Sequence, residues 1–301
     1  MLSRKNKLLL LKVLSLFSVV RGYNLLMIVL AQYLASIYIL SPNLPLRQVV
    51  FDVNLFVIVI ASALVIAAGY IINNFYDAEK DLINKPRKTM LDRLVSQRFK
   101  LSTYFVLNFL AVFAASYVSF RAVLFFSAYI FGIWFYSHKV KKIPFFGNFV
   151  SATLAITPFF AVFVYYKNFE TVIFVHAMFL FLLILARELI KDLENISGDV
   201  AQNYRTIPII YGVNVSKFLI AILMLLTLIP ALLLIFKFDV GYMNYYFAGC
   251  ILLFMLFLGI LFKSSTRKHF LWLHNILKLV IVVGVFSILL IDVDLVLNRI
   301  L

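Results

Sequence analysis

Cysteine, acidic residues and charge in general are scarce in this sequence. Cys250 is the single cysteine among 301 residues, which excludes a disulfide framework and a cysteine-rich metal site. Charged residues make up 14% of the chain, whereas ordinary soluble domains are about 25% charged. The composition therefore excludes an ordinary soluble globular domain.

Apolar residues take the place of the missing charge, at 64% of the chain with a mean hydropathy of +1.03. A membrane-spanning helix needs about 20 mostly apolar residues. The sequence predicts an all-α, polytopic membrane protein, a bundle of about nine transmembrane helices. We expect the spans near residues 21–40, 53–75, 102–119, 121–137, 147–166, 171–190, 214–236, 241–262 and 270–292.

The amino-terminal segment, residues 1–20, differs from these spans. Lys12 and Arg21 interrupt its apolar run and no small-residue cleavage site follows, so a cleaved signal peptide is not indicated. The pattern favours a basic amphipathic helix that lies on the membrane surface. We therefore predict two parts, this segment and one transmembrane domain over residues 21–301.

Lysine and arginine residues predict the orientation of the bundle. With the amino terminus in the cytoplasm, 22 of them lie on the cytoplasmic side and five on the other. Such an excess follows the positive-inside rule. We expect a multi-pass protein of the cell (inner) membrane, with membrane lipids as partners. The net charge of +15 needs no nucleic acid to explain it.

The first of two acidic clusters, NNFYDAEKD, directly follows the second predicted span. Asn73, Asp77 and Asp81 are four residues apart, so on a helix they share one face. Like charges one turn apart weaken a helix, which indicates that a ligand balances them.

The second cluster, RELIKDLENISGD, follows the sixth span. Glu188, Asp192, Asn195 and Asp199 are spaced by four, three and four residues and again share one face. Magnesium accepts one or two carboxylates together with phosphate oxygens. If the two faces converge, they form a Mg²⁺ site for a diphosphate. Acids in a solvated loop are the alternative, but they would not need this matched spacing.

These motifs resemble those of the UbiA superfamily of intramembrane prenyltransferases. NNFYDAEKD is similar to the first family motif, NxxxDxxxD, and KDLENISGD followed by RTIPIIYG is similar to the second. RGYN at the first span resembles R-P-x-N, and YSHKVKKIPFFGN follows the fourth span as in the family. In order and spacing, the resemblance covers nearly the whole chain.

The resemblance implies a Mg²⁺-dependent transfer of a polyprenyl group from its diphosphate to an acceptor in a membrane-facing cavity. It assigns catalytic roles to the acids Asp77, Asp81, Asp192 and Asp199. The implied metal ligands are Asn73, Asp77, Asp81, Asp192, Asn195 and Asp199. The implied substrate contacts are Arg21, Asn24, Asn73, Lys141, Asn148 and Arg205.

One departure from the family pattern concerns the second metal site. The first Asp of the family's DxxxD falls on Asn195, whose carbonyl oxygen can bind a hard cation but brings no charge. Asp192, one turn earlier on the same face, is the other candidate. Both assignments stay open at this point.

The acceptor is predicted from finer resemblances. DLINKP and the second motif resemble the branch with geranylgeranylglycerol-phosphate geranylgeranyltransferase, whereas RKTMLDRLVS replaces the common R-P-x-x-S-G. A lipid acceptor of the ether-lipid type is expected, and an aromatic acceptor of quinone biosynthesis is the alternative. A transporter, the alternative from another class, would need ionisable residues at mid-span, and Lys278 is the main one here.

Overall fold

The structure is a computed structural model that describes residues 4–293, and its regular structure there is helical. Nine helices in this range are long and apolar enough to cross a membrane. They are Gly22–Leu40 (α2, Gly22–Ala35, with a π-helical turn), α4 (Val53–Asn84), α6 (Gln97–Val118), α7 (Phe120–His138), α8 (Phe146–Tyr166), α9 (Thr171–Ala201), α11 (Gly212–Phe236), Gly241–Lys263 with α12 (Asn244–Lys263), and Arg267–Leu290 with α13 (Arg267–Ser287).

The nine predicted spans are confirmed, including the closely spaced third and fourth. Helix α6 ends at Val118, and the backbone of Ser119 is extended. The Ser119 hydroxyl then accepts a hydrogen bond from the backbone N–H of Ala122 at 3.1 Å. A serine N-cap of this kind begins a new helix at Phe120, so a single residue is enough to separate the two spans.

Helices α4 and α9 are longer than the predicted spans, which ended at residues 75 and 190. They contain 32 and 31 residues. At 1.5 Å per residue each is about 46–48 Å long, well beyond the ~30 Å hydrocarbon core. Each acidic cluster therefore continues the same helix as its span, rather than lying in a loop. We call the end of the bundle where they lie the motif end.

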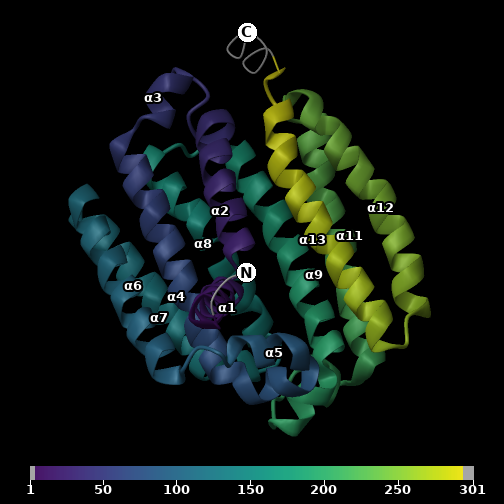
Figure 1. Cartoon of the computed structure of the whole chain (residues 1–301). Helices are drawn as coiled ribbons and strands as arrows, with labels where there is room; N and C mark the ends of the chain where they lie inside the picture. The colour runs from purple at the N-terminus through teal and green to yellow at the C-terminus, as the bar shows by residue number, and fades with distance from the viewer. Residues whose placement is uncertain (1–3, 294–301) are drawn as a thin grey trace.

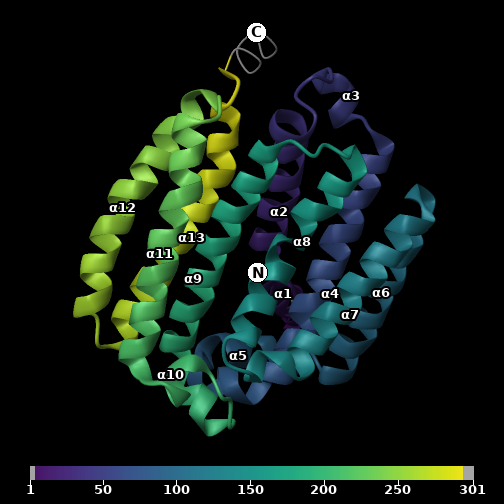
Figure 2. The ribbon, with the colours of Figure 1, turned by 180° about the vertical axis from the view of Figure 1, so that it is seen from behind.

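The same two helices are the most enclosed in the bundle (Figures 1 and 2). In the most apolar window of each helix, 67% of α4 and 56% of α9 is buried, against 17% for α6 and α7. Helices α2, α4, α6, α7 and α8 form one half, and α9, α11, α12 and α13 form the other. Because α4 and α9 also contact each other, they connect the two halves.

Large apolar side chains on the outside of the bundle fit a lipid environment. Phe109, Phe113, Phe236 and Leu256 are all more than 65% exposed. In water such surfaces would favour aggregation, but they are ordinary where lipid tails surround a helix. The chain is a multi-pass membrane protein.

Short helices cover the ends of the bundle: α1 (Arg4–Val19), α5 (Pro86–Asp92) and α10 (Ile207–Ile210) at the motif end, and α3 (Leu46–Val50) at the other. Figure 1 looks nearly along α1, which crosses the direction of the long helices. Ser15 donates to the backbone oxygen of Leu91 at 2.8 Å, and Ser18 to Asp92 Oδ1 at 3.0 Å. The boundary at residue 20 stays a prediction.

Candidate functional site

The two acidic clusters meet because the end of α4 packs closely against α9. The Asn84 amide donates to the backbone oxygen of Asn195 at 3.3 Å and accepts from the backbone N–H of Gly198 at 3.1 Å. A Cβ atom at position 198 would lie 2.3 Å from Asn84 Nδ2. Glycine at 198 therefore allows the approach of the two helices.

One lysine lies between the acids of the two clusters. Lys80 Nζ is 3.1 Å from Asp199 Oδ1 and 3.7 Å from Asp77 Oδ1. Its side chain is 12% exposed and Asp199 is 1% exposed. The predicted convergence of the two clusters is thus present in the fold, with one ammonium group balancing both carboxylates.

Asp77 also accepts hydrogen bonds from residues of two loops. Lys141 Nζ donates to Asp77 Oδ1 at 2.7 Å and to Asn73 Oδ1 at 3.3 Å, and the Tyr204 hydroxyl donates to Asp77 Oδ1 at 3.0 Å. Burial lowers the pKa of Lys141 to about 8, although the Asp77 carboxylate acts in the opposite direction. Burial and Asp77 raise the pKa of Tyr204, so this hydroxyl stays protonated and donates.

Backbone contacts fix the position of the two loops that carry these donors. Lys141 lies in the turn between α7 and α8, where a Cβ at Gly147 would be 2.9 Å from the Val140 carbonyl oxygen. The backbone N–H of Arg205 donates to the Lys142 carbonyl at 3.1 Å, which ties the loop after α9 to this turn. The Arg205 side chain is exposed.

The second cluster has a different set of contacts. Asp192 Oδ2 accepts a hydrogen bond from Asn148 Nδ2 at 2.7 Å. Asn195 is buried, and its side-chain oxygen has no hydrogen-bond partner. Asp81, one turn beyond Asp77, has no side-chain hydrogen bond or ion pair in residues 4–293.

Arg21 and Asn24 both contact Tyr70 of α4, which places them beside the first cluster. The Arg21 guanidinium is 4.9 Å from the centre of the Tyr70 ring, and Asn24 Nδ2 donates to the Tyr70 hydroxyl at 3.2 Å. Tyr70 precedes Asn73 by about one helical turn. RGYN is therefore placed next to the first cluster by the entry of α2 into the bundle.

Sequence reasoning missed two residues of the site, Lys80 and Tyr204. Lys80 had a usable signal, because residues three apart on a helix lie side by side and Lys80 follows Asp77 by three. Tyr204 lies in the loop after α9, where periodicity gives no information about side-chain direction.

The oxygen atoms present fit a hard cation. Among residues 4–293, no three carboxyl, imidazole or thiol groups lie close enough together to hold a metal on their own. Magnesium, however, binds through one or two carboxylates and takes its other oxygens from water and phosphate. Asp77, Asp199 and the unpartnered Asn195 oxygen supply that kind of set.

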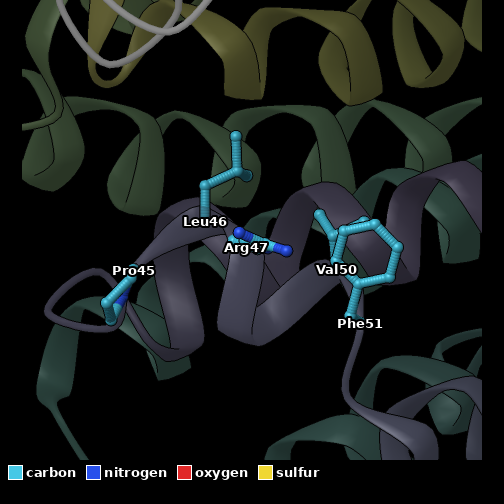
Figure 3. A pocket seen from close by; sticks show the side chains of 5 residues that line it. All are labelled: Pro45, Leu46, Arg47, Val50 and Phe51. Carbon is cyan, nitrogen blue, oxygen red and sulfur yellow. The ribbon is translucent and has the colours of Figure 1, made fainter.

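The hollow outlined in Figure 3 lies elsewhere. Its lining comes from α3 and its flanks, at the end of the bundle opposite the acidic clusters (Figures 1 and 3): Pro45, Leu46, Arg47, Val50 and Phe51. A single arginine and no acid line it, so we do not assign the chemistry there.

The chain is similar to known proteins in sequence and in fold. The model of the UbiA prenyltransferase family matches residues 25–282. A digeranylgeranylglyceryl phosphate synthase from Thermococcus sibiricus is 35% identical over 167 residues, which are 55% of this chain and 59% of that protein. The chain thus spans about three fifths of that relative.

Two solved structures share the fold. One, from work on digeranylgeranylglyceryl phosphate synthase in membranes, has a TM-score of 0.70 at 21% identity and covers 92% of this chain and 97% of that one. The other, a UbiA homolog from Archaeoglobus fulgidus bound to GPP and Mg²⁺, has a TM-score of 0.66 at 14% identity over 91% and 99% of the chains. The chain belongs to the UbiA prenyltransferase family.

Proposed function

We propose that this chain is a Mg²⁺-dependent prenyltransferase that moves a polyprenyl group from its diphosphate to geranylgeranylglyceryl phosphate. The family match and the named relatives support this activity and this acceptor class. An aromatic acceptor remains the competing substrate. The transporter alternative receives no support from the family match.

The observation that carries the proposal is that Asp77 and Asp199 both face the Lys80 ammonium, at 3.7 and 3.1 Å, while Lys141 also reaches Asp77. Two buried carboxylates on different helices with one positive charge between them form a cation site between two elements. Such a site suits a diphosphate, because metal ions bound by the carboxylates also bind phosphate oxygens and neutralise their charge.

We assign Asn73, Asp77 and Asp81 to the first metal site, and Asp199 with the carbonyl oxygen of Asn195 to the second. The second assignment rests on the unpartnered Asn195 oxygen and on the hydrogen bond that already occupies Asp192. When bound, Mg²⁺ stabilises the negative charge that develops on the leaving diphosphate.

The cationic groups of the chain bind the diphosphate in this scheme. Lys141 and Tyr204, which donate to Asp77, would bind phosphate oxygens when a metal ion is held by Asp77, and the exposed Arg205 side chain would join them. The bond between carbon one and the diphosphate breaks with its electron pair on the leaving oxygen. The acceptor hydroxyl forms the new bond to carbon one, and its proton leaves with the diphosphate.

The test is product identification by mass spectrometry. Purified protein would receive Mg²⁺, geranylgeranyl diphosphate and either geranylgeranylglyceryl phosphate or an aromatic acceptor. We expect a digeranylgeranylglyceryl phosphate product that the Asp199→Asn variant does not form. Prenylation of the aromatic acceptor alone would replace the proposed acceptor, and transfer to neither would refute the proposed reaction.

We also propose that the motif end faces the cytoplasm, across the cell (inner) membrane. The excess of lysine and arginine at that end supports this orientation. Arg87 is exposed on α5, so a cysteine there, in a Cys250→Ser background, should be labelled by an impermeant maleimide only after the membrane is opened. Labelling of intact cells would invert the topology.

A further inference from the structure

Lys278 is a charged residue deep within a membrane span. It lies 11 residues after the start of the 24-residue span Arg267–Leu290, about 16 Å along the helix. It has no ion pair or hydrogen bond within residues 4–293, and its side chain is exposed rather than packed in the core. An ionisable residue at such a depth is costly and is commonly functional.

The register of α13 against α9 shows where Lys278 points. His274 Nδ1 lies 2.6 Å from Glu194 Oε2, which joins the two helices. Lys278 follows His274 by one turn and is turned only about 40° from it, so it stays on the same side of α13. On α9, Arg187 precedes Glu194 by seven residues and shares its face. Lys278 and Arg187 therefore both lie beyond the Glu194–His274 pair, toward the middle of the membrane.

Arg187 has an unused donor at this level. Its Nη2 atom pairs with Glu188 Oε1 at 2.9 Å, but its buried Nε has no hydrogen-bond partner. A buried N–H group without an acceptor is unfavourable, which indicates an acceptor that arrives with a ligand.

Two more cations surround Lys278. Arg21, at the start of α2, and Lys85, which follows α4, both interact with it electrostatically, as does Arg187. Helix α13 also contacts α2 directly. The acid in this group is Glu194, and it is already shared between His274 and Lys85, the latter at 3.9 Å. The cluster therefore keeps an excess of positive charge.

We infer that Lys278, Arg187 and Arg21 bind the phosphate group of the lipid acceptor. This inference rests on the proposed function. A phosphate monoester supplies the acceptor oxygens and the negative charge that these groups lack. This site is distinct from the diphosphate site, because Glu194 of α9 pairs with His274 of α13, whereas Asp77 and Asp199 meet at Lys80. With the phosphate held there, the acceptor hydroxyl would be directed toward the diphosphate.

The experiment compares two acceptors that differ only in this phosphate, geranylgeranylglyceryl phosphate and geranylgeranylglycerol. In Lys278→Met we expect KM for the phosphorylated acceptor to rise about tenfold or more, the loss typical of a charged hydrogen bond. The KM for geranylgeranyl diphosphate and the turnover of geranylgeranylglycerol should not change. Lys278→Arg should restore most of the affinity. Lys268→Met, which removes an exposed lysine from the same helix, is the matched control.

A second measurement does not depend on turnover. Calorimetric binding of geranylgeranylglyceryl phosphate, without donor or metal, should weaken by a similar factor in Lys278→Met and stay unchanged in Lys268→Met. Equal losses for both acceptors would assign Lys278 a structural role, and an unchanged KM and binding constant would overturn the inference. If wild type binds this lipid through Lys278 but does not prenylate it, the proposed function fails and the phosphate site stands.

Discussion

The two acidic clusters lie side by side but differ in how their oxygens are occupied. In the first cluster, Asp77 accepts hydrogen bonds from Lys141 and Tyr204 and also faces Lys80. In the second, Asp199 faces Lys80, while the Asn195 oxygen has no partner. Donors from distant loops thus bind the first cluster, whereas the second cluster contains a buried side-chain oxygen, that of Asn195, without a hydrogen-bond partner.

This difference indicates a division of roles. Asp77 organises the loops that carry Lys141 and Tyr204, so its loss should disturb both cation binding and the placement of basic groups. Asp199 and Asn195, the proposed oxygen ligands of the second site, have few other contacts. Four sets of variants test this division of roles.

Loss of either central carboxylate should have the largest effect. Asp77→Asn and Asp199→Asn should each lower the turnover rate about 10³-fold or more, because developing charge on the diphosphate loses its metal-mediated stabilisation. Asp77→Asn should be the worse of the two, since it also frees Lys141. Single-turnover assays with Mg²⁺ titration measure both, and full activity in excess chelator would rule out this mechanism.

Gly198→Ala tests the contact that brings the clusters together. The added Cβ would lie 2.3 Å from Asn84 Nδ2, so α4 and α9 must separate. We expect a loss of about 1–3 kcal/mol in the free energy of unfolding, as for other overpacked sites, together with weaker Mg²⁺ dependence of activity. Gly249→Ala, with nothing within 4 Å of its Cβ, is the control for thermal unfolding in detergent. Equal behaviour of the two variants would contradict the packing argument.

Lys80→Met removes the cation that both clusters share. Without divalent metal, the buried Asp199 carboxylate then loses its ion-pair partner while Lys141 still pairs with Asp77, and removing one partner of a buried pair costs about 3–5 kcal/mol. The melting temperature should fall in chelator and recover with Mg²⁺. Lys88 Nζ lies 3.6 Å from Asp92 Oδ2 and the Lys88 side chain is 36% exposed, so Lys88→Met should show no such recovery. If the Lys80 variant is equally stable in chelator and in Mg²⁺, the two clusters are not coupled electrostatically through Lys80.

The smallest effect should come from the polar residues of the second cluster. Asn195→Asp adds a charged ligand at an unpartnered position and should tighten Mg²⁺ binding about tenfold, because ligand charge sets affinity for hard cations. Asp192→Asn should leave the Mg²⁺ titration curve unchanged, since Asp192 Oδ2 already accepts the Asn148 amide. A shift with Asp192→Asn as large as with Asp199→Asn would assign the ligand role to Asp192.

Local information was enough to predict much of the fold and part of the site. The spans follow from apolar runs, because a segment in lipid must satisfy its own backbone hydrogen bonds and becomes a helix. The shared faces of the two clusters follow from helical spacing. The lengths of α4 and α9 could not be predicted in this way, because in each case the apolar run ends before the helix does.

A membrane bundle, its family motifs and two acid-bearing helical faces follow from the sequence alone, because hydropathy and helical periodicity are local properties. The packing of the folded chain was needed to show that Asn84 and Gly198 join those faces, that Lys80 lies between them and that Tyr204 reaches Asp77. It also placed Lys278 beyond the Glu194–His274 pair. These contacts join residues up to 127 positions apart, and the packing of helices, not local preference, selects such pairs.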